Sequence, residues 1–365
     1  MKVLVYGCGV IGSQLIHVLC KAGNDVTVVS KSRWGEVLKE KGLHIRHYLQ
    51  RKETVDHFRV TDTLPDEEFD AVFSVMQGIQ QESVLEELGK AKAPMVIFVG
   101  NNPLCEETEK KFMEHCEGNR SVLFGFQGTA GERFEDRVTV LHWGDGSMTV
   151  GKLHKEVSAA ERITLISAFS GTDYSLRFED DMHGWLWSHA AFILPAALEC
   201  YALGGDLRNI GNSRLSELLD AIRECYALLK RAGIKIRPEG DESLFDSRLK
   251  MTGIKSALHF FCKTKIGELA ASVHCKNAVS EMEWLDLCFK KLRLENPDVA
   301  MPAFDRLRRS APSWEELHET YDNRDKSEDL KTPPVPVRKI VLAAGSAILL
   351  TAAVSAFTKA VKDNK

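Results

Sequence analysis

The chain has 365 residues, of which 44% are hydrophobic and 27% charged, and its net charge at pH 7 is −4. This length and composition are typical of a globular protein with two domains, and the slightly acidic balance excludes a basic protein that binds nucleic acid. Nine cysteines are scattered without a C-x-x-C pair. They predict buried, reduced thiols in a cytosolic protein, and no metal-binding residues are expected.

The first thirty residues carry a glycine-rich loop between a strand and a helix. An apolar strand at residues 2–6 precedes the loop, and a second strand is expected at Asp25–Ser30. Strand, G-x-G-x-x-G, helix and strand in this order predict a dinucleotide site, with the diphosphate at the helix N-terminus. The alternative is a glycine-rich turn without a ligand. The expected cofactor-binding residues of the loop are Gly7, Cys8, Gly9, Val10, Ile11 and Gly12, with Cys8 filling space.

The end of the second strand indicates which dinucleotide binds. NAD-binding proteins usually place Asp or Glu there for the ribose 2′-hydroxyl, but this chain has Ser30, Lys31, Ser32 and Arg33. Cations and hydroxyls suit a 2′-phosphate. We therefore predict NADP(H), with Lys31 and Arg33 as phosphate partners, against the alternative that both are solvated loop charges.

Strands and helices alternate over residues 1–155 and predict a Rossmann-type α/β domain with a mainly parallel sheet. Further strands are expected at Ala71–Val75, Met95–Val99, Ser121–Gly125, Val138–His142 and Ser147–Val150, and helices at Ser83–Lys90 and Glu106–Cys116.

Residues 156–318 predict an all-helical second domain that serves the substrate and dimerisation. The expected helices are Ala159–Ser170, Met182–Ala202, Ser213–Ala232, Ala257–Ala271 and Ala278–Leu292.

The last part of the chain differs from both domains. Residues 319–338 are polar and then proline-rich, which predicts a flexible linker. Within residues 339–365, the stretch 340–358 has no charged side chain and lies between Lys339 and Lys359. As a helix it spans roughly 28 Å, which matches the hydrocarbon core of a bilayer. It predicts a C-terminal transmembrane anchor with the other domains in the cytoplasm, and a buried core helix is the alternative.

Several motifs resemble the ketopantoate reductase (2-dehydropantoate 2-reductase) family over roughly residues 1–310. In order they are GCGVIG, SKSR, FDAVFSVMQGIQ, FVGNN, SVLFGFQGTAGER, VTVLHWGDGSMTVGK, DMHGWLWSHAAFI and SEMEWL. The resemblance implies an NADPH-dependent ketone reductase with a Rossmann domain, a helical domain and an active site between them. It assigns Asn101 to the nicotinamide side and Glu281 to the family's glutamate.

The family's two lysines are missing. The position of the catalytic lysine holds His189, and that of the second lysine, after the fourth strand, holds Gln77. These lysines would polarise the ketone and hold an acidic substrate, so ketopantoate itself is not the expected substrate. We still expect Gln77 and Asn101 beside the cofactor.

His189 is the candidate acid, because an imidazolium with an ordinary pKa of about 6.5 suits proton donation to the forming alkoxide. His274 and Glu281 would share a face with each other if one helix spans both, and they complete a candidate catalytic set of His189, Asn101, Glu281 and His274. A hydrogen-bonded core histidine is the equal alternative for His189.

The leading hypothesis is therefore an NADPH-dependent oxidoreductase acting on a small carbonyl compound or hydroxy acid, anchored to a membrane and able to form a homodimer. The runner-up is an NADP(H)-binding module with altered catalysis that acts as a membrane-tethered redox sensor or scaffold.

Overall fold

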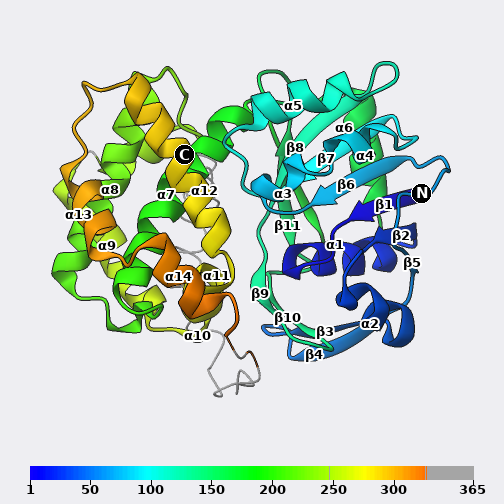
Figure 1. The fold of residues 1–365 in the computed structure, drawn as a ribbon, viewed down its shortest axis with the longest axis horizontal. Coiled ribbons are helices and arrows are strands. Elements are labelled where there is room, and N and C mark those ends of the chain that lie inside the picture. The colour runs from blue at the N-terminus through cyan, green and yellow to red at the C-terminus, as the bar shows by residue number, and fades with distance from the viewer. Residues whose placement is uncertain (246, 325, 327–365) are drawn as a thin grey trace, which may run out of the picture. The chain divides into compact units, whose positions relative to one another are not determined.

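A computed structural model describes residues 1–245, 247–324 and 326, and divides the chain into two units, Met1–Leu186 and Trp187–Lys365 (Figure 1). The boundary lies later than the expected end of the first domain at residue 155. Helix α6 (Ala159–Ala168) and strand β12 (Ser175–Glu179) explain the difference. β12 pairs with a strand of the first unit's sheet, and Leu165 of α6 joins that unit's buried cluster. The helix expected at Ala159–Ser170 forms, but it belongs to the first unit.

The first unit is built on an eight-stranded sheet in the order β12-β11-β8-β7-β6-β1-β2-β5. Every neighbouring pair is parallel except β11 with β8. This confirms the predicted Rossmann-type α/β domain. The strands are β1 (Lys2–Tyr6), β2 (Asp25–Val29), β5 (Arg59–Thr61), β6 (Ala71–Val75), β7 (Met95–Val99), β8 (Ser121–Gln127), β11 (Ser147–Gly151) and β12.

Side chains of the large sheet alternate between its two faces, as the pleat requires. Val3 and Val5 of β1 join one buried cluster, whereas Leu4 and Tyr6 join the other. Helices cover both faces, which explains why the central strands read as continuous apolar runs. The helices of this unit are α1 (Val10–Lys21), α2 (Arg33–Lys41), α3 (Gly78–Glu82), α4 (Leu85–Gly89), α5 (Cys105–Glu114), α6 and the start of α7 (Met182–Ala202).

A second, four-stranded sheet in the order β4-β3-β10-β9 was not expected. The strand expected at Val138–His142 forms as β10, but it belongs to this small sheet rather than to the large one. Helix α1 lies between the sheets, where it contacts β2 as well as β3, β9 and β10 (Figure 1). The strands are β3 (Leu43–His47), β4 (Lys52–Asp56), β9 (Ala130–Arg133) and β10 (Val138–Leu141).

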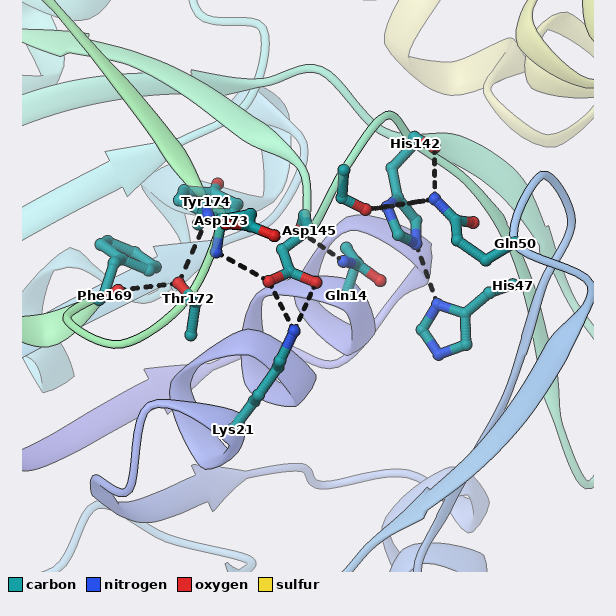
Figure 2. Close-up of polar contacts among 11 residues, drawn as sticks. Gln14, Lys21, His47, Gln50, His142, Asp145, Phe169, Thr172, Asp173 and Tyr174 are labelled. Carbon is teal, nitrogen blue, oxygen red and sulfur yellow. Dashed lines mark hydrogen bonds and ion pairs between the residues drawn. The ribbon is translucent and has the colours of Figure 1, made fainter.

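Polar side chains fasten α1 to its surroundings (Figure 2). Lys21 Nζ lies 2.6 Å from Asp145 Oδ2, and Gln14 Nε2 donates to the Asp145 carbonyl oxygen at 2.9 Å. His17 Nδ1 lies 2.8 Å from Asp56 Oδ2. Asp145 also accepts from the backbone N–H of Asp173 at 2.8 Å. The helix that carries the glycine loop is therefore held at three points along its length.

Two buried histidines of the small sheet form a hydrogen bond next to α1 (Figure 2). His142 Nδ1 lies 3.0 Å from the Gly144 carbonyl oxygen, which only accepts, so Nδ1 carries the proton. His142 Nε2 then accepts from His47 Nδ1 at 2.9 Å, and His47 Nε2 accepts from the Thr54 hydroxyl at 2.8 Å. Burial is the largest cause that lowers the pKa of His47 to about 3 and that of His142 to about 4. Both rings are neutral at neutral pH.

The folded protein should lose stability in mild acid because of these two rings. In the unfolded chain both titrate near pH 6.5, so below that pH the unfolded state binds more protons than the folded state. The contribution of the two neutral rings to the free energy of unfolding is fully present above about pH 6.5 and is lost as the pH falls toward 4. Between pH 7 and pH 5 we expect a loss of the order of 1 kcal/mol for each ring, measured by urea unfolding.

The exposed histidine His44, on the same strand as His47, supplies the control. His44→Gln should leave this pH dependence unchanged, whereas a double variant His47→Gln, His142→Gln should reduce it. An unfolding free energy that stays constant between pH 7 and pH 5 would contradict the neutral assignment.

The second unit is helical throughout its regular structure in the described residues, as expected. Helix α7 begins in the first unit and continues into the second, and its bounds match the prediction. Buried Glu199 of α7 is ion-paired with Arg214. The other elements are η1 (Leu207–Asn209), α8 (Asn212–Arg231), η2 (Asp241–Phe245), α9 (Arg248–Cys262), α10 (Lys265–Gly267), η3 (Glu268–Ser272), α11 (Val273–Asn277), α12 (Val279–Glu295), α13 (Pro302–Ser310) and α14 (Trp314–Tyr321).

The first residues of the linker expected at 319–338 are helical instead, because α14 (Trp314–Tyr321) continues to Tyr321. Most of that linker and the whole predicted membrane anchor, with its apolar stretch 340–358, lie outside the described residues. None of the helices in the described part of the chain combines the length and the apolar character needed to span a bilayer.

Candidate functional site

The three glycines of the loop between β1 and α1 have different surroundings. Gly7 has φ +101°, and a Cβ there would lie 2.4 Å from the Val75 carbonyl oxygen. A Cβ on Gly12 would lie 2.4 Å from the Gly7 carbonyl oxygen. Around Gly9, in contrast, a Cβ would meet nothing within 4 Å. Internal packing thus requires glycine at 7 and 12, whereas at 9 the absent side chain leaves open space in front of the helix.

The open space at Gly9 lies at the N-terminus of α1. Gly9 is the N-cap, no side chain caps the helix, and its first turn contains no acidic residue. The first N–H groups of a helix lack intrahelical acceptors and favour an anion. β1 also has β2 on one side and β6 on the other, which is the point where the strand order reverses and where such sheets bind ligands. This geometry suits a dinucleotide diphosphate.

Cys8 lies inside the loop as a buried thiol. Its Sγ is 3.4 Å from Ser13 Oγ, and burial raises the pKa of the thiol. A protonated, buried thiol is a poor nucleophile. The geometry agrees with the prediction that Cys8 fills space.

The two cations after β2 are not equivalent. Lys31 Nζ lies 2.6 Å from Glu87 Oε2 of α4, and Glu87 also accepts from the Tyr6 hydroxyl at 2.8 Å. The hydrogen bond to Glu87 is the largest cause that raises the pKa of Lys31. Arg33 is exposed at the start of α2 and has no ion pair among the described residues. Arg33 is therefore the cation available to a 2′-phosphate.

Arg133, a further cation in this region, was not among the predicted cofactor residues. Arg133 ends β9, and its guanidinium carbon lies 5.6 Å from the ring centroid of buried Trp34 in α2. Trp34 belongs to the same buried cluster as Cys8 of the glycine loop. A second exposed cation thus lies beside α2 and the loop. Only the small sheet, which the sequence pattern did not reveal, places it there.

Gln77, Asn101 and Asn102 follow the carboxyl ends of β6, which pairs with β1, and of β7, which pairs with β6. Gln77 is the N-cap of α3, and Asn101 is buried. Asn102 Nδ2 donates to Gln81 Oε1 at 3.0 Å and to Thr108 Oγ1 at 2.8 Å, which fixes the turn that follows β7. The predicted cofactor residues of this unit therefore gather at one edge of the sheet.

Of the three catalytic candidates in the second unit, His274 and Glu281 lie close together. His274 Nε2 is 3.7 Å from Glu281 Oε2, and the charge of His274 is one of the causes acting on the pKa of His189. The condition that one helix spans both His274 and Glu281 is not met, because α11 ends at Asn277 and α12 begins at Val279. Their roles stay a prediction.

The protonation state of His189 differs from the expectation. His189 is buried, and burial is the main cause that lowers its pKa to about 3. At neutral pH the ring is therefore a neutral imidazole, which differs from the imidazolium of the acid interpretation and is compatible with the alternative of a core histidine. A neutral imidazole can still donate a hydrogen bond to a carbonyl oxygen, and a nearby substrate carboxylate would raise the pKa of the ring.

Comparisons with known proteins show what part of the first unit is similar to. Residues 3–155 match the family described as ketopantoate reductase PanE/ApbA. No curated protein matches the chain significantly in sequence.

Solved structures share the fold across most of the chain. A ternary structure of D-mandelate dehydrogenase with NADH and anilino(oxo)acetate is 17% identical, with a TM-score of 0.65, and covers 88% of this chain and 100% of its own. The 2-dehydropantoate 2-reductase from Methylococcus capsulatus is 17% identical, with a TM-score of 0.60, and covers 90% and 100%. The dimeric ketopantoate reductase from Staphylococcus aureus is 12% identical, with a TM-score of 0.60, and covers 88% and 99%.

Proposed function

We propose that this chain, whose residues 3–155 carry the ketopantoate reductase PanE/ApbA domain, is an NADPH-dependent oxidoreductase that reduces a small 2-keto acid or related carbonyl compound. The observation that carries the proposal is the open space at Gly9, in front of an uncapped helix at the strand-order reversal. The family domain and the keto-acid chemistry in the names of the similar structures support it. The experiment is substrate-dependent NADPH oxidation by the full chain with a panel of 2-keto acids.

Ketopantoate itself is not the proposed substrate. The resemblance places the family's two lysines at His189 and Gln77, neither of which carries a permanent positive charge. When bound, NADPH supplies the hydride that adds to the carbonyl carbon, and the oxygen then needs a proton. We assign His189 to the carbonyl oxygen, as a neutral hydrogen-bond donor or as the acid once an anionic substrate has raised its pKa.

Arg33 is the residue expected to distinguish NADPH from NADH. Its guanidinium is exposed without an ion pair, and a bidentate contact to a phosphate is a strong charge-assisted hydrogen bond. Arg33→Ala should weaken NADPH binding by about 10- to 100-fold, the equivalent of about 1.5–3 kcal/mol. NADH binding, which involves no 2′-phosphate, should stay unchanged. Both affinities are measured by fluorescence titration.

Lys31→Ala is the matched control for Arg33→Ala. The ammonium of Lys31 is already paired with Glu87, so its removal should affect NADPH less than the removal of Arg33. Equal losses of NADPH and NADH binding in Arg33→Ala would show that Arg33 does not recognise the 2′-phosphate.

A membrane anchor at residues 340–358, with the other domains in the cytoplasm, is part of the proposal. Its support is the uncharged stretch between Lys339 and Lys359. The full chain should sediment with membranes and resist extraction by high salt and alkali, whereas a chain ending at residue 338 should stay in the supernatant. A full chain that alkali releases would contradict the anchor. Homodimer formation also stays a proposal, to be tested by the mass of the detergent-solubilised protein.

A binding module with altered catalysis is the second candidate function. The observation that favours it is the buried, neutral His189 at the position of the family's catalytic lysine. Such a protein would bind NADPH saturably but reduce none of the 2-keto acids. Substitutions at His189 would then change only the stability of the fold.

A further inference from the structure

Two histidines and a glutamate meet on the first unit, apart from the glycine loop. Glu106 is in the first turn of α5, His154 follows β11, and His183 is in the first turn of α7. Three segments that are distant in the sequence therefore each contribute one side chain with a metal-binding atom. This group was not predicted from the sequence, because its members are not spaced as a motif.

The potential ligand atoms of the three residues all lie within 4.8 Å of one another. His154 Nε2 is 2.5 Å from Glu106 Oε1, and His183 Nε2 is 3.7 Å from Glu106 Oε2. The two imidazole rings lie with their centroids 5.1 Å apart. Ligands of a tetrahedral zinc ion, at bond lengths of about 2.0–2.1 Å, are roughly 3.3 Å apart. Small side-chain rotations would bring all three atoms to that separation.

The electrostatic state of the group also suits a metal ion. His183 is largely buried, and burial is the main cause that lowers its pKa, so its imidazole is neutral at neutral pH. His154 has a further carboxylate behind it, since its Nδ1 lies 3.8 Å from Asp181 Oδ1. Metal-bound histidines commonly have such a carboxylate on the other ring nitrogen, which fixes the tautomer and orients the ring.

We propose that Glu106, His154 and His183 bind a divalent transition-metal ion of the zinc type, with water in the open position. Imidazole ligands favour zinc, nickel or cobalt over magnesium or calcium. The ion would join the first turn of α7 to α5, just after the loop that carries Asn101 and Asn102. It would act as a tether between segments, and this role does not depend on the proposed reductase activity.

Metal binding by the full chain tests the proposal. After chelator treatment, the protein is titrated with Zn²⁺ by calorimetry and with Co²⁺ by absorption spectroscopy. We expect one equivalent to bind, and we expect His154→Ala, His183→Ala and Glu106→Gln each to weaken binding by at least about 10-fold. The Co²⁺ spectrum should lack thiolate charge-transfer bands, since the nine cysteines take no part. His115→Ala, which removes an exposed histidine at the end of α5, should bind like the unsubstituted chain.

Thermal unfolding of the metal-free variants shows that each remains folded. If one of them unfolds, the other two still decide the question. Zn²⁺ that binds equally to the unsubstituted chain and the folded variants overturns the proposal, as does a thiolate spectrum or the absence of saturable binding.

Discussion

Replacing Gly9 by valine is expected to weaken NADPH binding by about 100-fold or more, the equivalent of at least about 2.7 kcal/mol, while the protein stays folded. Gly9 has φ −78° and ψ −160°, an extended conformation that any residue adopts. A Cβ there meets no atom of the chain within 4 Å. The new side chain would instead occupy the space through which a diphosphate approaches the N-terminus of α1. Fluorescence titration with NADPH measures the loss.

Gly211→Val is the matched control for Gly9→Val. Gly211 is also the N-cap of a helix, α8, with an extended backbone and no atom within 4 Å of a Cβ. Both substitutions carry the same small cost in helix capping, about 1 kcal/mol or less, but only Gly9→Val should affect NADPH. Gly12→Ala provides the opposite case, since its Cβ would collide with the Gly7 carbonyl oxygen and destabilise the fold. NADPH binding to Gly9→Val as tight as to the unsubstituted chain would refute the assignment of the loop.

His189→Ala is expected to reduce turnover by roughly 10²- to 10⁴-fold, the usual contribution of a positioned acid. NADPH affinity should stay unchanged, because the glycine loop and Arg33 belong to the other unit. Steady-state kinetics with saturating NADPH measures the loss, and thermal unfolding reports the separate cost of removing a buried side chain. Unchanged turnover in folded His189→Ala would favour the binding module instead.

A second substitution distinguishes the two roles open to His189. The side chain of His189→Gln can donate a hydrogen bond but cannot transfer a proton at neutral pH. If the neutral imidazole only polarises the carbonyl, His189→Gln should keep much more turnover than His189→Ala. If the ring becomes the acid, both variants should be equally slow, and the unsubstituted enzyme should show a pH dependence that His189→Gln lacks.

The sequence predicted the glycine loop and the central strands well, because their signals are local. The loop follows an apolar strand directly, and the parallel strands covered on both faces appear as apolar runs such as Met95–Val99. Strands β3, β4 and β9 of the small sheet were missed because they contain charged residues, as in Lys52–Asp56, and because the sheet depends on the pairing of β3 with the distant β10. Helix α6 was assigned to the wrong unit, since a helical pattern does not reveal which surface its apolar face covers.

The candidate site shows the same division between local and distant information. From the residue types alone, Lys31 and Arg33 were both predicted to bind the 2′-phosphate. The fold pairs Lys31 with Glu87 of α4 and leaves Arg33 available to that phosphate. Likewise, the sequence suggested His189 as an acid, whereas its burial among packed helices makes the ring neutral. The spacing of His274 and Glu281 allowed a shared face only on a single helix, whereas the two side chains approach each other across the break between α11 and α12.

The central claim is that this chain is an NADPH-dependent reductase of a small 2-keto acid. Its most direct test is the rate of NADPH oxidation by the purified full chain with a panel of 2-keto acids, with Gly9→Val assayed in parallel. At least one 2-keto acid should be reduced with saturable dependence on both substrate and NADPH, and faster with NADPH than with NADH. Gly9→Val should abolish this rate. Saturable NADPH binding without oxidation by any member of the panel would contradict the central claim.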